Sequence, residues 1–169
     1  AVHVEVENVD YVINKNYMQD ICRNLDIPLI QKKISLKENS KNKSVCFICS
    51  WQRRKTIFNL SRELGCNKLA FGHHRDDALQ TFLMNLMYHG SISSMPYSLK
   101  MFEGRMNLIR PLLDLWEKDL KEYAILNNIV KEEKICPWED KTKRKYTEDL
   151  LLQIEEHYPK AKVNMFHAL

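Results

Sequence analysis

The stretch that decides the fold is KLAFGHHRDDALQTFLMNLMYHG, at positions 68–90. Its first four residues predict a short strand, and apolar side chains from position 78 to position 87 recur at helical spacing. Gly90 is a typical helix-ending residue. Between the strand and the helix stands GHHRDD, residues 72–77, the densest polar cluster in the chain. A strand that turns into a helix in this way is typical of an α/β protein, whose ligands bind at the carboxyl ends of the strands.

The same alternation extends to both sides of this stretch. Val2, Val4 and Val6 alternate with polar residues and predict a strand with one buried face. Further helices are expected at 16–25, 57–64, 114–124 and 146–154, further extended segments at 27–30 and 108–113, and loops at 37–44 and 91–106. Asp114 and Glu117 have the spacing of a capping box at the start of a helix. We therefore predict a single α/β domain over residues 1–169, built on a parallel sheet.

Composition restricts the class of protein. The 169 residues are 44% hydrophobic and 28% charged, with only four Gly and five Pro, so disordered and collagen-like chains are excluded. No apolar run is long enough to span a membrane, and no secretory signal is visible near the start of the chain. Five cysteines in a chain of this size favour reduced thiols over a disulfide framework. We expect a cytoplasmic protein without a membrane partner.

The GHHRDD cluster is a candidate ligand site. Gly72 permits close approach to the helix N-terminus, which attracts phosphate. Asp76 and Asp77 are oxygen ligands of the kind that Mg²⁺ prefers, and His73 and His74 add two imidazoles. Alternatively, the aspartates only cap the helix and the histidines only fill a turn.

Cysteines form a second candidate site. Cys46 and Cys49 make a CxxC just before a basic helix, and Cys136 stands before the second basic run. Three thiolates can bind Zn²⁺ or an iron–sulfur cluster, although a lone CxxC is also consistent with a redox dithiol or ordinary thiols. Cys22 and Cys66 fall in predicted regular elements and are interpreted as structural.

Basic residues flank both cysteine segments. The net charge of +4 is too small to establish a nucleic-acid partner. Clustered cations nevertheless attract phosphate, and the other interpretation is a solvated basic surface. The candidate RNA-binding residues are Arg53, Arg54, Lys55, Lys141, Lys143, Arg144 and Lys145.

Three stretches carry a resemblance to a known family. They begin with CFICSWQRRK at residue 46 and run to residue 96, then comprise LIRPLLDLWEKDLKEYA at 108–124 and HYPKAKVNMFHAL at 157–169. Together they closely resemble the tRNA 2-thiocytidine synthetase family of PP-loop ATPases. This resemblance implies an adenine-nucleotide alpha-hydrolase-like fold and an enzyme that adenylates a tRNA cytidine with ATP and Mg²⁺ and then substitutes sulfur. It also implies a [4Fe-4S] cluster on three cysteines, of which Cys46 and Cys49 match the family CxxC. Cys136 matches the later cysteine region, where the family has a second CxxC and this chain reads ICPWED.

The chain departs from the family pattern at its beginning. The family's first strand leads into an SGGKDS-type loop that holds the pyrophosphate of ATP, but the four glycines of this chain stand at 65, 72, 90 and 104. We therefore expect an N-terminally truncated PP-loop fold with little activity of its own, which binds tRNA, requires a sulfur donor and pairs as a homodimer. The residues alone leave open whether it acts as an enzyme. The alternatives are a noncatalytic RNA- or protein-binding module with a cysteine metal site, and a zinc-stabilised structural domain.

Overall fold

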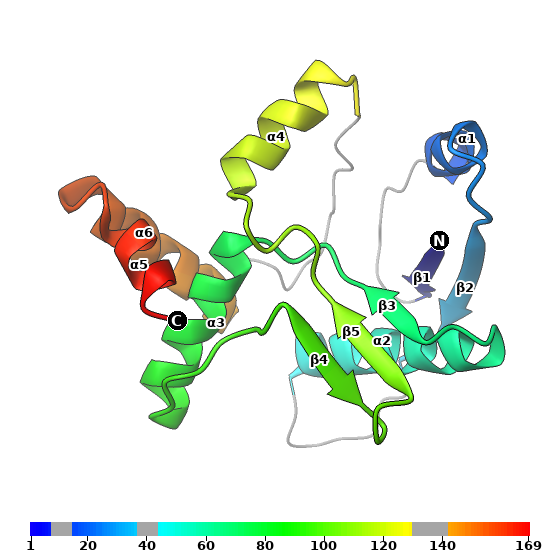
Figure 1. Cartoon of the computed structure of the whole chain (residues 1–169), viewed down its shortest axis with the longest axis horizontal. Coiled ribbons are helices and arrows are strands. Elements are labelled where there is room, and N and C mark those ends of the chain that lie inside the picture. The colour runs from blue at the N-terminus through cyan, green and yellow to red at the C-terminus, as the bar shows by residue number, and fades with distance from the viewer. Residues whose placement is uncertain (8–14, 37–43, 130–141) are drawn as a thin grey trace. The chain divides into compact units, whose positions relative to one another are not determined.

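The computed structural model describes residues 1–7, 15–36, 44–129 and 142–169 (Figure 1). The chain forms two compact units, the first containing the described residues up to 65 and the second those from 66 onward. Each unit is treated separately below. Among the described helices, none has both the length and the apolar character needed to cross a membrane.

The first unit contains β1 (Val2–Val6), α1 (Lys15–Asn24), β2 (Ile30–Ile34) and α2 (Val45–Glu63). The predicted strand at the start of the chain and the helix after it are confirmed. β1 and β2 run parallel, from Val2 opposite Ile30 to Val6 opposite Ile34. The extended segment expected at 27–30 was therefore placed too early, because pairing with β1 determines where β2 begins. The side chains of Val4, Val6 and Cys22 are buried, as expected for a core.

Helix α2 begins earlier than its apolar spacing indicated. The Ser44 hydroxyl accepts a hydrogen bond from the backbone N–H of Phe47 at 3.3 Å and so caps the helix. The cap places the CxxC inside α2, where we had expected it just before the helix. At the other end Gly65, with φ of +68°, takes the left-handed conformation that stops the helix.

The second unit has a three-stranded sheet in the order β3 (Lys68–Ala70), β5 (Met106–Ile109), β4 (Ser98–Met101). β3 and β5 are parallel, whereas β4 is antiparallel to β5. The expectation of an irregular segment from 91 to 106 was therefore wrong, because β4 lies within it. The strand expected at 108–113 is shorter at its far end, where Pro111 has no N–H to donate to a sheet.

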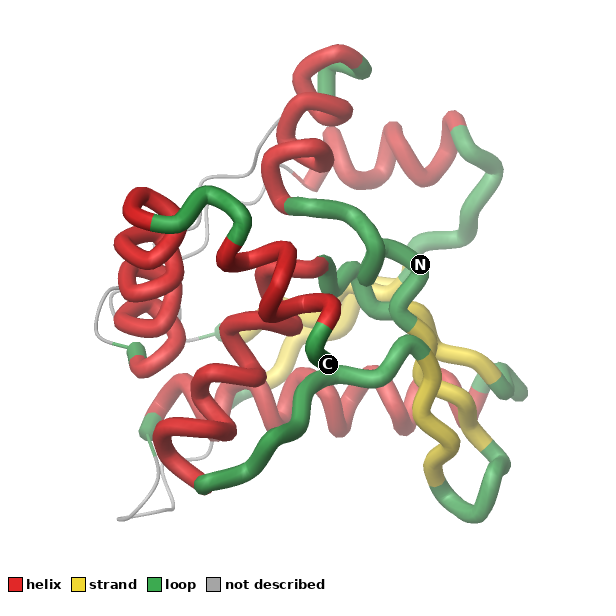
Figure 2. Tube along the Cα trace, turned by 60° about the vertical axis from the view of Figure 1, so that its left-hand side comes forward, coloured by secondary structure: helices red, strands yellow, loops and turns green. Residues whose placement is uncertain are grey.

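Four helices are described in this unit, namely α3 (Arg75–His89), α4 (Glu117–Leu126), α5 (Lys143–His157) and α6 (Ala161–His167). Helices α3, α5 and α6 lie side by side (Figure 2). Their core consists of Leu79, Leu83 and Leu151. Met165 and Phe166 of α6 pack against this core. The helix predicted from the apolar residues 78–87 and ended at Gly90 is confirmed as α3, but α6 was missed as a separate element.

The start of α4 differs from the prediction. The Asp119 carboxylate accepts a hydrogen bond from the backbone N–H of Trp116 at 3.3 Å. The capping box of α4 is therefore formed by Trp116 and Asp119. Asp114 instead accepts a hydrogen bond from the Tyr97 hydroxyl at 2.7 Å. The predicted pairing of Asp114 with Glu117 was wrong because Asp114 lies in the preceding turn.

Candidate functional site

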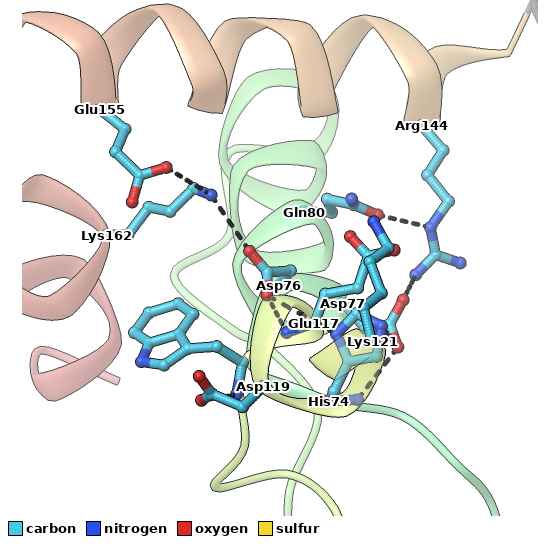
Figure 3. Close-up of polar contacts among 11 residues, drawn as sticks. His74, Asp76, Asp77, Gln80, Glu117, Asp119, Lys121, Arg144, Glu155 and Lys162 are labelled. Carbon is cyan, nitrogen blue, oxygen red and sulfur yellow. Dashed lines mark hydrogen bonds and ion pairs between the residues drawn. The ribbon is translucent and has the colours of Figure 1, made fainter. Parts of the chain in front are cut away.

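The GHHRDD cluster follows β3, and its last three residues form the first turn of α3. His74, Asp76 and Asp77 of the cluster are drawn in Figure 3. His74 is the N-cap residue, and its backbone N–H donates to Asp77 Oδ2 at 3.0 Å. This contact is the capping role that the sequence left as an alternative. A Cβ added at Gly72 would meet no atom of the described residues within 4 Å, so those residues leave space beside the backbone there.

Asp77 also links α3 to α5. Its Oδ1 accepts a hydrogen bond from Arg144 Nη2 at 2.5 Å, while Arg144 Nε donates to Gln80 Oε1 at 2.7 Å (Figure 3). Because one guanidinium holds two residues of α3, the N-terminus of α5 is fixed beside this helix. Arg144 was predicted to bind RNA, and in the structure its Nε and Nη2 atoms donate to protein groups.

Asp76 links α3 to two other helices. Its Oδ1 lies 3.2 Å from Lys162 Nζ on α6, and its Oδ2 accepts a hydrogen bond from the backbone N–H of Glu117 at 2.9 Å. Lys162 also pairs with Glu155 at 2.8 Å. Burial by itself lowers the pKa of Lys162, but hydrogen bonds to Glu155 and Asp76 outweigh it and raise the pKa above its ordinary value of 10.5. The Lys162 ammonium is therefore charged at physiological pH.

Arg75 adds a cation–π contact to the same turn. Its guanidinium carbon lies 5.1 Å from the ring centre of Trp116 and 4.8 Å from that of Phe166. Asp114 Oδ1 approaches the guanidinium at 3.8 Å. Consecutive residues 75, 76 and 77 thus contact α6, the start of α4 and the start of α5.

The two histidines of the turn have different surroundings. The ring nitrogens of His74 lie 3.8 Å from Asp76 and 3.5 Å from Asp77, distances at which an ion pair forms only if the ring is protonated. His73 has a buried Nδ1 without a hydrogen-bond partner among the described residues. Burial lowers its pKa below 6.5, although Asp77 acts in the opposite direction, so the His73 imidazole is neutral at pH 7.

The described residues contain no group of three or more His, Cys, Asp or Glu side chains placed to hold a metal ion. Both carboxylates of the turn have protein partners. Asp76 contacts Lys162 and Glu117. Asp77 contacts His74 and Arg144. The Mg²⁺ role suggested for these two residues stays a prediction.

The CxxC lies near the N-terminal end of α2. Cys46 and Cys49 are three residues apart on a helix and therefore share a face, and both side chains are partly buried. None of the described cysteines forms a disulfide. Cys66 is exposed in the connection between α2 and β3, so its assignment to a regular element was wrong. Cys136 lies outside the described residues.

The predicted RNA-binding residues that the structure describes fall on two helices. Arg53, Arg54 and Lys55 are in the middle of α2. Lys55 Nζ lies 5.1 Å from the ring centre of Trp51, and Arg54 Nε donates to the Ser50 carbonyl at 3.2 Å.

The second basic run begins α5 and is engaged within the protein. Lys143 lies 4.1 Å above the Tyr88 ring, and Lys145 pairs with Glu148 at 3.5 Å and with Asp149 at 3.2 Å. Lys141 lies outside the described residues. Binding of phosphate by either run stays a prediction.

Sequence reasoning missed the partners of the turn. It assigned no role to Gln80, Trp116, Lys162 or Phe166, although 162 and 166 have the spacing of one helix face and lie in a stretch that carries the family resemblance. Glu117 and Lys162 stand 41 and 86 positions from Asp76, so only the fold brings them together.

Comparison with known proteins agrees with this architecture. The solved U34-tRNA thiolase NcsA from Methanococcus maripaludis, described with its [4Fe-4S] cluster, superposes with a TM-score of 0.74 over 99% of this chain and 59% of its own, at 20% identity. That likeness establishes the fold, and together with the family match given below it confirms the predicted adenine-nucleotide alpha-hydrolase-like class.

Curated relatives are more similar in sequence. The tRNA-cytidine(32) 2-sulfurtransferase of Sorangium cellulosum is 37% identical over 130 residues, covering 76% of this chain and 46% of the relative. The enzyme of the same name from Anaeromyxobacter dehalogenans (strain 2CP-C) is 32% identical over 158 residues, covering 90% of this chain and 54% of the relative. The chain thus spans about half the length of these relatives. A family model described as "PP-loop domain" matches residues 8–147, and the chain therefore belongs to the PP-loop domain family.

Proposed function

We propose that the protein carrying this chain is a tRNA-cytidine 2-sulfurtransferase. The observation that carries the proposal is the CxxC near the start of α2, in a chain 32% to 37% identical to relatives of that name. Thiolates at a helix N-terminus, three residues apart, fit two ligands of an iron–sulfur cluster. Cys136 is proposed as the third ligand, and when bound the cluster would supply an iron site for a sulfide nucleophile.

The proposed reaction has two steps. In the first step the carbonyl oxygen of the tRNA cytosine attacks the α-phosphorus of ATP, and pyrophosphate leaves. In the second step sulfide adds to the carbon of that carbonyl group, and AMP departs with the former carbonyl oxygen. We propose that Gly72, His73 and His74 line the nucleotide or target base, and that Asp76 and Asp77 order this turn and assist with Mg²⁺. Support comes from the space beside the Gly72 backbone and from the buried Nδ1 of His73, both of which lack a neighbour or hydrogen-bond partner among the described residues. A cytoplasmic location, an external sulfur donor and a homodimer complete the proposal.

The complete gene product tests the reaction. Purified without oxygen and supplied with ATP, Mg²⁺, sulfide and unmodified tRNA, it is expected to form 2-thiocytidine, detected by mass spectrometry of the digested nucleosides. Product should be absent when ATP is omitted. Tight tRNA binding without ATP-dependent product would contradict the proposal and support a noncatalytic RNA-binding module.

Arg53 and Arg54 are expected to contact tRNA phosphates. Replacing both by alanine should weaken binding and reduce the slope of log affinity against log salt by about 0.7 for each phosphate of single-stranded RNA that the variant no longer neutralises. Filter binding at several salt concentrations measures this slope. The matched control replaces Lys100 and Arg105, two exposed cations of the second unit, and should leave the slope near that of the wild type. Equal slopes for the wild type and the Arg53→Ala, Arg54→Ala variant would eliminate this pair as phosphate contacts.

A further inference from the structure

The C-terminal helix α6 reaches two consecutive residues of the GHHRDD turn. Lys162 contacts Asp76, which is 86 positions away in sequence, and Phe166 lies against the Arg75 guanidinium. Residues 162 and 166 are one helical turn apart, so a single face of α6 provides both contacts.

The contact between Lys162 and Asp76 is enclosed. Their side chains are 12% and 13% exposed, which limits replacement of either partner by water. Lys162 occupies one carboxylate oxygen and the Glu117 N–H occupies the other, so the plane of the Asp76 carboxylate is held at both ends (Figure 3). Glu155 holds Lys162 from the other side at 2.8 Å. The ammonium therefore has little freedom to leave Asp76.

We propose that Lys162 is a positioning residue for tRNA thiolation, which acts by fixing the Asp76 carboxylate and with it the first turn of α3. This inference rests on the proposed function, because it assigns the turn to the reaction. In the part of the chain that the structure describes, Lys162 contacts the turn through Asp76. The position of α6 itself depends on Met165 and Phe166 in the apolar core, so removal of the Lys162 charge leaves the helix anchored.

The proposal is tested first without catalysis. In Lys162→Met the Asp76 carboxylate loses one of its two fixed partners and is free to rotate away from the Glu117 N–H. Amide hydrogen exchange at Glu117, measured in the full chain, is therefore expected to accelerate at least tenfold. Lys162→Arg restores a cation and should exchange nearly as slowly as the wild type. The matched control, Lys160→Met, removes an exposed lysine two residues away and should change nothing.

The second measurement is thiolation by the complete gene product. Loss of a residue that orients a site typically lowers activity by about 10-fold to 100-fold. We expect a decrease of that size in kcat for Lys162→Met, with the KM for tRNA unchanged and kcat largely restored in Lys162→Arg. A purely structural role predicts instead a loss proportional to the unfolded fraction, without rescue.

Unchanged Glu117 exchange in Lys162→Met, or an equal decrease in kcat for Lys160→Met, would overturn the inference. Failure of the proposed function gives a different result. A wild-type protein that makes no 2-thiocytidine can still be compared with Lys162→Met by amide exchange at Glu117. Faster Glu117 exchange in Lys162→Met would then show that Lys162 orders the turn, whereas its assignment to tRNA thiolation would be wrong.

Discussion

Replacing Cys46 by serine is expected to remove the iron–sulfur absorbance of the anaerobically purified protein and to abolish 2-thiocytidine formation. A serine hydroxyl is a poor substitute for the thiolate that iron prefers. Cys49→Ser and Cys136→Ser should have the same effect if the three residues share one cluster. Iron and zinc analysis of each variant, together with the visible spectrum, measures the loss.

Cys66 provides the matched control. It is an exposed cysteine that follows α2, and Cys66→Ser should keep the wild-type iron content and activity. A Cys46→Ser protein that retains all its iron would refute the ligand assignment. Zinc in place of iron in the wild-type protein would support the zinc-stabilised structural domain instead.

Leu79→Ala is expected to reduce the free energy of unfolding by about 2 to 5 kcal/mol. The Leu79 side chain is 0% exposed and belongs to the core that joins α3 to α5, with Phe166 of α6 packed against it. Truncation leaves a cavity next to these three helices. Because the free energy of unfolding of a typical protein is about 5 to 15 kcal/mol, a loss of this size is a large fraction of the total stability.

Denaturant unfolding of the full chain measures this loss. Leu86→Ala, the same substitution two turns further along α3, is the control. Leu86 is 41% exposed and should cost less than about 1 kcal/mol. Equal losses for the two variants would contradict the placement of the core.

The local spacing of apolar and polar residues was sufficient to predict the helices and strands that carry the candidate site residues. The alternation of Val2, Val4 and Val6, the strand at 68–71 and the helix ended by Gly90 all depend on neighbouring residues, and each is found near its predicted place. The GHHRDD turn follows from the same local rule, since its polar residues separate a strand from a helix. The family resemblance rested on such local motifs and is confirmed by the match to the PP-loop domain.

The predictions of strand positions were wrong where pairing with a second strand determines which residues form the strand. β4 has no strong alternation of its own and exists because Ser98–Met101 pairs with β5. Similarly, β2 begins at Ile30 because β1 is its partner, whatever the residues before it favour.

The sequence by itself determined the family, the strand-to-helix turn and the position of the CxxC motif. Only the tertiary structure decided what the turn contacts, because hydrogen bonds from Arg144 to Asp77 and from Lys162 to Asp76 join residues 67 and 86 positions apart. Local spacing carries no information about such pairs. They form because burial of Leu79, Leu83 and Leu151 packs α3 against α5, and Met165 and Phe166 of α6 pack against the same core. Each charge enclosed between these helices then requires a partner.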